Sequence, residues 1–225
     1  MSAAADALDR VDQVVQGRRG RLSIGFSTAA EGVPLVREIM RRYSEWAHDV
    51  EFETTERDFS DPSAGLADGT TQVAFIFGPP PIEGLSSVTL LEERRLVAMR
   101  PDEPLAARAS LTVDELVDLR WLRTPSAQGP WESFWFSHPA GGPSGSVIRT
   151  AAEWVTAVEA GRGVAYTMPT VMLDFANRRI QVVPVDGLEP AALLMAWHTA
   201  DRDPLVKAFV SRALDVPGAR TDESG

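Results

Sequence analysis

One strand, turn and helix near the N-terminus constrain the fold of this chain most. Leu22–Phe26 has the pattern of a short buried strand, and it runs directly into Ser27 and Thr28 and then into a helical pattern. In an open α/β sheet, ligands collect at the carboxyl ends of the strands, where helix N-termini also point. Two hydroxyl groups at that position, followed by the small Ala29, suit a small polar or anionic ligand. The unit therefore predicts an α/β domain with a binding crevice.

The segments that follow continue this alternation. A helical pattern covers 36–46, and strand patterns cover 50–54 and 71–77. Between these strands, 61–69 has the pattern of a short helix with Asp61 as its N-cap. This β-α-β-α-β order predicts a first sheet that is mostly parallel, with right-handed crossovers.

The second half of the chain alternates in a similar way. A long strand pattern covers 87–100, and Thr112 with Glu115 forms a capping box at the start of a short helix. The other expected elements are strands at 121–123, 146–149, 163–166, 180–183 and 191–197, and helices at 151–160, from Pro169 onward and at 203–214. A chain of 225 residues fits one large domain or two lobes of about 100 residues each.

Composition narrows the classes of function. The net charge of −10, from 22 basic and 32 acidic residues, argues against nucleic-acid binding by this chain alone. The sequence has no cysteine, which excludes disulfides, thiol catalysis and thiolate metal sites. No apolar run is long enough to cross a membrane, and the N-terminus lacks the apolar core of a signal peptide. We therefore expect a cytoplasmic protein with no membrane partner.

No pattern in the sequence indicates catalysis or metal binding. The three histidines, His48, His138 and His198, are far apart and have no metal-ligand spacing. The stretch 142–146 ends in serine where a nucleophile elbow needs glycine, and 161–163 lacks the third glycine of a dinucleotide loop. We expect no cofactor, no metal and no catalytic residue, and therefore not an enzyme.

Small and polar residues follow several of the predicted strands, at positions that converge on one cleft in a two-lobe fold. These candidate ligand-binding residues are Ser27, Thr28 and Ala29 after the first strand, Thr54 and Thr55 after the second, Gly78 and Pro79 after the third, and Thr124, Ser126, Thr167 and Met168 after strands of the second lobe. Any of these hydroxyls could instead cap a helix, Ser27 or Thr28 in particular.

Two further pairs of residues are ambiguous from sequence. Trp131 either lines the cleft or packs in the core, so it is also a candidate ligand-binding residue, whereas Trp135 is expected in the core of the second lobe. Arg94 and Arg95 alternate on a predicted strand, so one of them faces outward, and the sequence assigns neither a role.

The order of five segments resembles a known family. RLSIGF, VAMRPDEPLA, LTVDELVDLRWL, VEAGRGVAYTMP and LLMAWHTADRDPLVKAFV together are similar to the effector-binding, or substrate-binding, domain of LysR-type transcriptional regulators, over residues 5–215. The resemblance implies an α/β fold like that of type II periplasmic binding proteins, with two Rossmann-like lobes joined by two crossover strands. It implies lobe I at 21–98 plus 198–216, lobe II at 99–197, the end of a linker helix at 1–20 and a tail at 217–225.

The resemblance also implies a function. A small metabolite, such as a carboxylate or a similar polar ligand, would bind in the cleft between the lobes. Two copies would form a homodimer through lobe I, with exposed apolar residues of the helix 33–46 and its neighbouring strand in contact, and a full-length regulator could form a tetramer. The family's winged helix-turn-helix is not in this sequence, so we expect DNA binding only through a domain absent from this chain.

Two other classes of function stay open at this point. The first is a free-standing small-molecule binding protein of the same fold, without a DNA-binding function. The second is an enzyme on the same fold, which would need a histidine or carboxylate facing Ser27 in the cleft, and the spacing of residues offers none.

Overall fold

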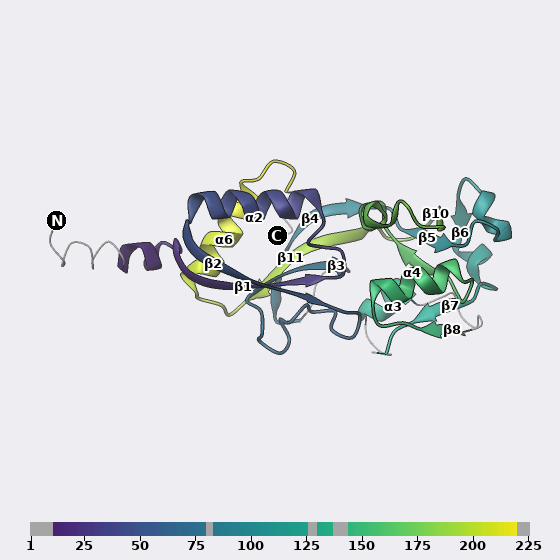
Figure 1. Ribbon diagram of the computed structural model, residues 1–225, viewed down its shortest axis with the longest axis horizontal. Helices are drawn as coiled ribbons and strands as arrows, with labels where there is room; N and C mark the ends of the chain where they lie inside the picture. The colour runs from purple at the N-terminus through teal and green to yellow at the C-terminus, as the bar shows by residue number, and fades with distance from the viewer. Residues whose placement is uncertain (1–10, 80–82, 126–129, 137–143, 220–225) are drawn as a thin grey trace.

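The computed structural model describes residues 11–79, 83–125, 130–136 and 144–219 (Figure 1). The molecule is elongated and consists of two α/β lobes that follow one another along its long axis (Figure 1). Each lobe is built on its own sheet, one of five strands and one of four. This is the predicted architecture of two lobes connected by two crossings of the chain.

Lobe I, as we call the part built on the larger sheet, contains strands in the order β2-β1-β3-β11-β4. Their bounds are Arg19–Ser27 (β1), Asp49–Arg57 (β2), Val73–Gly78 (β3), Leu85–Glu93 (β4) and Ala191–His198 (β11). Strand β1 is parallel to β2 and β3, whereas β11 is antiparallel to β3 and β4. Strands β1 to β4 therefore run in one direction, in keeping with the predicted mostly parallel sheet, and β11, which enters from the other lobe, is the strand that runs against them.

Lobe II contains a sheet in the order β6-β10-β5-β9 and a separate pair, β7 and β8. The strands are Leu96–Met99 (β5), Leu111–Thr112 (β6), Trp121–Arg123 (β7), Ser144–Val147 (β8), Ala165–Thr167 (β9) and Gln181–Asp186 (β10). The α-helices are Pro130–Phe136 (α3), Ala151–Glu159 (α4) and Pro169–Met172 (α5), and the 3₁₀ helices are Pro104–Ala107 (η1), Val113–Leu116 (η2) and Leu173–Phe175 (η3). The predicted capping box of Thr112 and Glu115 is present at η2.

The chain crosses between the sheets at Arg94–Arg95 and again at 187–190. The single strand predicted over 87–100 is therefore wrong, because this segment divides into β4 in lobe I and β5 in lobe II. Sheet membership changes a few residues before each predicted lobe boundary, so β5 lies with the smaller sheet and β11 with the larger.

The segment 61–69 forms successive turns and not the predicted helix. Asp61 does act as a cap, because its carboxylate accepts hydrogen bonds from the backbone N–H groups of Ser63 and Gly65 at 3.1 and 2.8 Å. The backbone then leaves the helical region, with φ of 50° at Ala64 and 90° at Gly65. Left-handed residues of this kind end a helix, so the turn cannot propagate.

Helix α2 (Pro34–Trp46) covers lobe I together with α6 (Pro204–Leu214) (Figure 1). Its N-cap is Val33 and Pro34 occupies the first turn, so neither Ser27 nor Thr28 caps it. The rings of Tyr43 in α2 and Phe209 in α6 meet edge to face with centroids 5.0 Å apart. The last helix therefore returns to lobe I, as the family resemblance predicts.

The segment before β1 is attached to this core by a buried hydrogen bond. Residues 11–15 are helical, and the helix ends at Gly17 with φ of 67°. The Tyr43 hydroxyl donates to the Gly17 carbonyl oxygen at 2.6 Å. Burial, with the nearby charge of Asp203 as a smaller cause, raises the pKa of Tyr43 to about 12.

The outer face of α2 is charged. Glu38 pairs with Arg41 and Arg42, and Arg41 also pairs with Glu45. The expectation that this helix exposes apolar residues is wrong, because its apolar side chains are buried or half-buried under the charged row.

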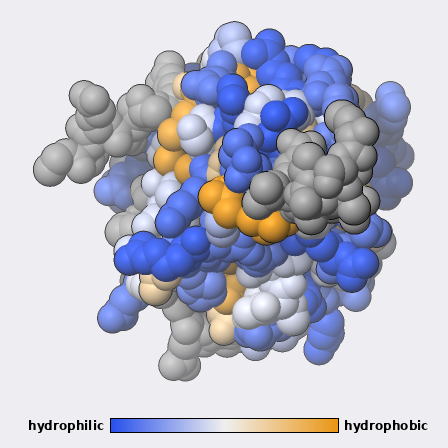
Figure 2. Space-filling view, turned by 90° about the vertical axis from the view of Figure 1, so that its left-hand side faces the viewer, coloured by the Kyte–Doolittle hydropathy of each residue, from blue (hydrophilic) through white to orange (hydrophobic). Residues whose placement is uncertain are grey.

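The large hydrophobic residues that are exposed in the described parts are Val11, Val14, Val15, Val147 and Leu173. The end of the molecule near the N-terminal segment is mostly hydrophilic, with small hydrophobic areas (Figure 2). None of the helices in the described ranges has the length and apolar character to cross a bilayer.

Candidate functional site

A cavity of about 70 Å³ lies between the two lobes. It opens at the carboxyl ends of β1, β3 and β9, which is where an α/β fold of this kind holds its ligands. Its walls come from lobe I (Ser27, Thr28, Arg57, Asp58, Phe59, Asp61, Pro62 and Phe77) and from lobe II (Trp131, Trp135, Ala151, Trp154, Tyr166, Thr167, Val171 and Phe175). Both lobes are therefore needed to form it.

The turn after β1 forms the floor of the cavity on the lobe I side. Ser27 is 7% exposed, and its Oγ accepts a hydrogen bond from the backbone N–H of Phe77 at 3.1 Å. The backbone turns sharply here, with Ala30 N–H donating to the Ser27 carbonyl oxygen at 2.9 Å and Ala29 at φ of 67°. Alanine is uncommon in this left-handed conformation, which normally favours glycine. The turn holds Ser27 and the half-buried Thr28 toward lobe II.

The loop after β2 closes one side of the cavity. Phe59 N–H donates to the Arg149 carbonyl oxygen of lobe II at 2.8 Å, so this loop is bound across the cleft. The Asp58 carboxylate accepts hydrogen bonds from the hydroxyl and the backbone N–H of Ser60, which hold the pKa of Asp58 below its ordinary value. Asp58 is therefore ionised at neutral pH.

Arg57 is the one basic residue among the described residues that line the cavity. Its Nη2 donates to Thr70 Oγ1 at 2.6 Å and lies 3.7 Å from Asp68, and its Nε lies 3.8 Å from Asp61. The Arg57 charge is thus already balanced by two carboxylates. Its buried Nε has no hydrogen-bond partner within the described part of the chain.

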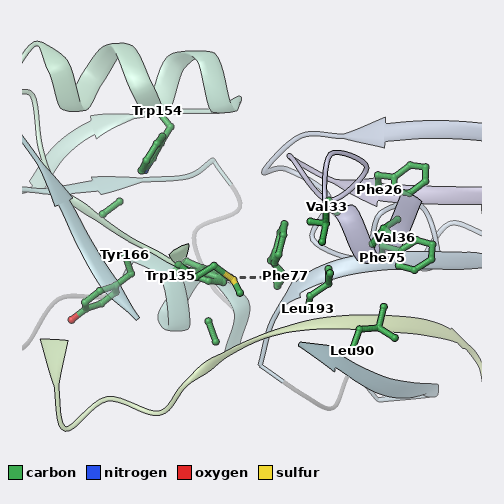
Figure 3. Close-up of a cluster of buried hydrophobic side chains, with 14 of the residues drawn as sticks. Phe26, Val33, Val36, Phe75, Phe77, Leu90, Trp135, Trp154, Tyr166 and Leu193 are labelled. Atoms are coloured by element: carbon green, nitrogen blue, oxygen red, sulfur yellow. Dashed lines mark hydrogen bonds between the residues drawn. The ribbon is translucent and has the colours of Figure 1, made fainter. Parts of the chain in front are cut away.

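Two tryptophans of α3 join the lobes. Trp131 Nε1 donates to the Phe77 carbonyl oxygen at 2.8 Å, and Trp135 Nε1 donates to the same oxygen at 3.3 Å. Phe77 itself stands between the lobe I core and the aromatic residues of lobe II (Figure 3). Gly78 permits this approach, since a Cβ there would lie 3.0 Å from Trp131 Cδ1.

Strand β9 supplies the polar group on the lobe II side. Thr167 is 3% exposed, and its Oγ1 has no hydrogen-bond partner among the described residues. Tyr166 also lines the cavity, and burial raises the pKa of its phenol, so the hydroxyl stays protonated at neutral pH. A buried hydroxyl without a partner costs free energy, which a ligand oxygen or nitrogen could recover.

The crossing segment carries a network that sequence reasoning missed. Arg95 is 7% exposed and donates to the carbonyl oxygens of Glu189 at 2.9 Å and Phe134 at 2.7 Å. Its guanidinium also lies 4.0 Å from the ring centroid of Phe134 and 5.1 Å from that of Tyr166. Arg95 thus connects both crossing segments to α3 and β9, which form the lobe II wall.

Glu93, at the end of β4, makes a second connection at the crossing. Its carboxylate accepts from the backbone N–H of Thr170 at 2.8 Å and from its hydroxyl at 2.7 Å. An acidic side chain from lobe I therefore caps the first turn of α5 in lobe II. Such a bond ties the orientation of α5 to the position of the crossing strand.

The cavity brings together some of the predicted ligand-binding residues and not others. Ser27, Thr28, Trp131 and Thr167 line it, and the core residue Trp135 lines it as well while being 6% exposed. Ala29, Thr54, Thr55, Gly78, Pro79, Thr124 and Met168 do not line it, and Ser126 lies outside the described residues. Thr54 and Thr55 are exposed within β2, because that strand continues to Arg57. Thr124 and Met168 are buried away from the cavity.

Comparison with known sequences identifies the family. The family described as LysR substrate binding domain matches residues 16–217. The chain belongs to this family. A curated relative, the uncharacterized HTH-type transcriptional regulator YnfL of Escherichia coli (strain K12), is 27% identical over 116 residues, which cover 52% of this chain and 39% of that regulator. The matched part therefore spans less than half the length of this relative.

Solved structures show the same fold at low sequence identity. The effector-binding domain of QuiR in complex with shikimate has a TM-score of 0.69 and 15% identity, covering 88% of this chain and 96% of that chain. The regulatory domain of CcmR from Synechocystis PCC6803 in complex with 2-PG has a TM-score of 0.69 and 13% identity, covering 92% and 99%. Full-length CbnR with its target DNA has a TM-score of 0.65 and 15% identity, covering 94% of this chain and 73% of that chain. The LysR substrate-binding family is one of regulator domains and not a known family of enzymes.

Proposed function

We propose that this LysR substrate-binding domain senses a small-molecule effector in the cavity between its lobes. The single observation that supports the proposal most directly is the composition of the cavity wall, to which both lobes contribute. A ligand that touches both lobes binds one relative orientation of the lobes better than others, so it shifts their equilibrium. QuiR and CcmR, which share the fold, are described in complexes with the small molecules shikimate and 2-PG.

The effector would be bound and released unchanged. The described cavity wall has no histidine or lysine to act as a base beside Ser27 or Thr167. The carboxylates in that wall, Asp58 and Asp61, accept hydrogen bonds from their own loops. Recovery of the ligand in unaltered form after prolonged incubation with the protein tests this part of the proposal. In a regulator that acts on DNA, the domain would work in the cytoplasm.

A thermal-shift screen tests effector binding. A ligand at 100 times its Kd stabilises the folded state by about 2.7 kcal/mol, which corresponds to about 5–11 °C for a chain of this length. The screen covers carboxylates, aromatic acids, amides and amino acids. If saturating members of every class left the melting temperature unchanged, the proposal would be refuted.

A pair of variants locates the binding site. Thr28→Arg places a long side chain at the wall of a 70 Å³ cavity and should abolish the thermal shift of any compound found in the screen. Thr156→Arg is the matched control, because Thr156 is exposed on α4 and its hydroxyl is bonded to the Ala152 carbonyl oxygen. Equal loss of the shift in both variants would contradict binding in this cavity.

We further propose that two copies pair through lobe I, in keeping with the role of a regulator domain. Strand β2 lies at the edge of its sheet, so its outer backbone groups are open to a partner, and the adjacent face of α2 carries the charged row of Glu38, Arg41 and Glu45. Light scattering should give twice the chain mass of 24.5 kDa. Arg41→Glu should reduce the dimer, whereas Arg178→Glu in lobe II should not, and a monomer for the unaltered chain would overturn this interface.

A further inference from the structure

The walls of the inter-lobe cavity are rich in aromatic side chains. Lobe II supplies most of the rings and lobe I adds two, and the full set is Phe59, Phe77, Trp131, Trp135, Trp154, Tyr166 and Phe175. Some of these rings are in direct contact, since the centroids of Phe59 and Trp131 are 6.0 Å apart and those of Trp154 and Phe175 are 5.7 Å apart. Surfaces of this kind favour a flat aromatic ligand, which can stack or meet them edge to face.

The cavity wall also carries neutral polar groups that a ligand can reach. Ser27 Oγ already accepts the Phe77 N–H, so its own proton is the part left for a ligand. Thr167 Oγ1 is buried without a partner among the described residues, and it can donate or accept. The Arg57 Nε–H, also unpartnered among them, can donate to a ligand oxygen. These groups therefore favour a ligand with one compact polar group that both donates and accepts hydrogen bonds.

The charges around the cavity disfavour an anion. Arg57 is already balanced by Asp61 and Asp68, and Asp58 adds a further ionised carboxylate on the same side. A ligand carboxylate would lie near like charges and would gain little from a guanidinium that is already paired. A cation gains little as well, because the Asp58 and Asp61 carboxylates accept hydrogen bonds from their own loops.

We propose that the effector is an uncharged, planar aromatic molecule with an amide-like polar group. The ring lies between the aromatic walls, and the polar group meets Ser27, Thr167 and Arg57 Nε. This inference rests on the proposed function of the cavity, and it replaces the carboxylate expected from the family resemblance with a neutral ligand class.

The size of the cavity gives the inference a spectroscopic consequence. A volume of about 70 Å³ is smaller than a typical small-molecule pocket of roughly 300–1,000 Å³, so a ring enters only when the walls separate. The Trp131 Nε1–Phe77 O bond of 2.8 Å is part of the wall that must move. Binding should therefore change the fluorescence of the indole groups.

The test uses four probes of similar size. Benzamide, benzoate and benzamidine carry the same ring with a neutral, an anionic and a cationic group, and cyclohexanecarboxamide keeps the amide without the aromatic ring. Titration calorimetry and tryptophan fluorescence on the full chain should show benzamide binding at least about 10-fold more tightly than each of the other three. Loss of a good polar contact in a buried site typically reaches this size, about 1.4 kcal/mol for each factor of ten.

One variant separates ligand contact from a merely structural role. Thr167→Val keeps the shape of the side chain and removes a buried hydroxyl that has no partner in the described structure. The variant should therefore raise the melting temperature of the free protein and weaken its binding of benzamide about 10-fold. Thr156→Val, on the exposed face of α4, is the matched control and should leave benzamide binding unchanged.

The outcomes are distinct. Tighter binding of benzoate or benzamidine than of benzamide would overturn the neutral class and leave effector sensing intact. Equal binding of cyclohexanecarboxamide would overturn the aromatic part. If none of the four probes bound, the inference would fail, while the broader thermal-shift screen would still decide the proposed function.

Discussion

Arg95 offers the sharpest test of how the lobes are joined. It is 7% exposed and donates to the carbonyl oxygens of Glu189 and Phe134, and its guanidinium lies over the Phe134 ring at 4.0 Å. Arg95→Leu removes both hydrogen bonds and leaves two carbonyl groups without their donor. Hydrogen bonds to a charged group contribute about 1.5–3 kcal/mol each, and the leucine recovers part of this by apolar burial.

The expected net loss in the free energy of unfolding is about 3 kcal/mol. For a chain of this length, each kcal/mol changes the melting temperature by about 2–4 °C, so Arg95→Leu should melt about 6–12 °C lower. Far-UV circular dichroism during heating measures the change, and urea unfolding gives the free energy directly.

The neighbouring residue provides the control. Arg94 is exposed and forms a 3.4 Å ion pair with the equally exposed Asp186. Exposed ion pairs contribute about 0–1 kcal/mol, so Arg94→Leu should change stability by less than about 1 kcal/mol. If the two variants were equally stable, Arg95 would not tie the crossing segments to α3 and the reasoning would be refuted.

Three other changes have defined outcomes. Tyr43→Phe removes the buried 2.6 Å bond to the Gly17 carbonyl and should destabilise the protein by about 1–2 kcal/mol in urea unfolding, and an unchanged midpoint would contradict this. Ala29→Gly should stabilise it by about 1 kcal/mol, since Ala29 has φ of 67°, and a lower melting temperature would show that the turn is not strained. The folded-state pKa of Asp58 is lowered by Ser60, so the stabilisation by the ionised carboxylate is present above the unfolded pKa of about 3.9 and disappears as pH falls through the lower folded value. Asp58→Asn should therefore cost about 0.5 kcal/mol at pH 7 and progressively less as the pH falls below the unfolded pKa, and a cost independent of pH would contradict the assignment.

Local patterns were sufficient to predict most elements of this fold. The stripe of Val36, Ile39 and Tyr43 predicted α2, and the box of Thr112 and Glu115 predicted the start of η2, because each signal lies within a few consecutive residues. The left-handed backbone at Ala64 was not predictable in this way, since alanine gives no signal for such a conformation and favours the helix that the pattern suggested.

The parts of the site that the sequence did not predict depend on contacts between distant residues. The sequence predicted that one of Arg94 and Arg95 faces outward, but two identical side chains gave no signal for which one is buried. Phe59 follows a strand that extends three residues further than its pattern suggested, so the candidates Thr54 and Thr55 stop short of the cavity. Trp131, a candidate from the sequence, lines the cavity, but the sequence has no signal for its hydrogen-bond acceptor, a backbone oxygen 54 residues away.

The bond between α3 and Phe77 has a consequence for how the domain could diversify. The acceptor is a main-chain oxygen, so every amino acid at position 77 supplies it. Substitutions of other side chains around the cavity can therefore adapt it to a new ligand, while the hydrogen bonds between α3 and the main-chain oxygen of residue 77 are kept. A designer who wished to change the specificity of this domain could randomise the wall residues freely and keep two tryptophans and one peptide group.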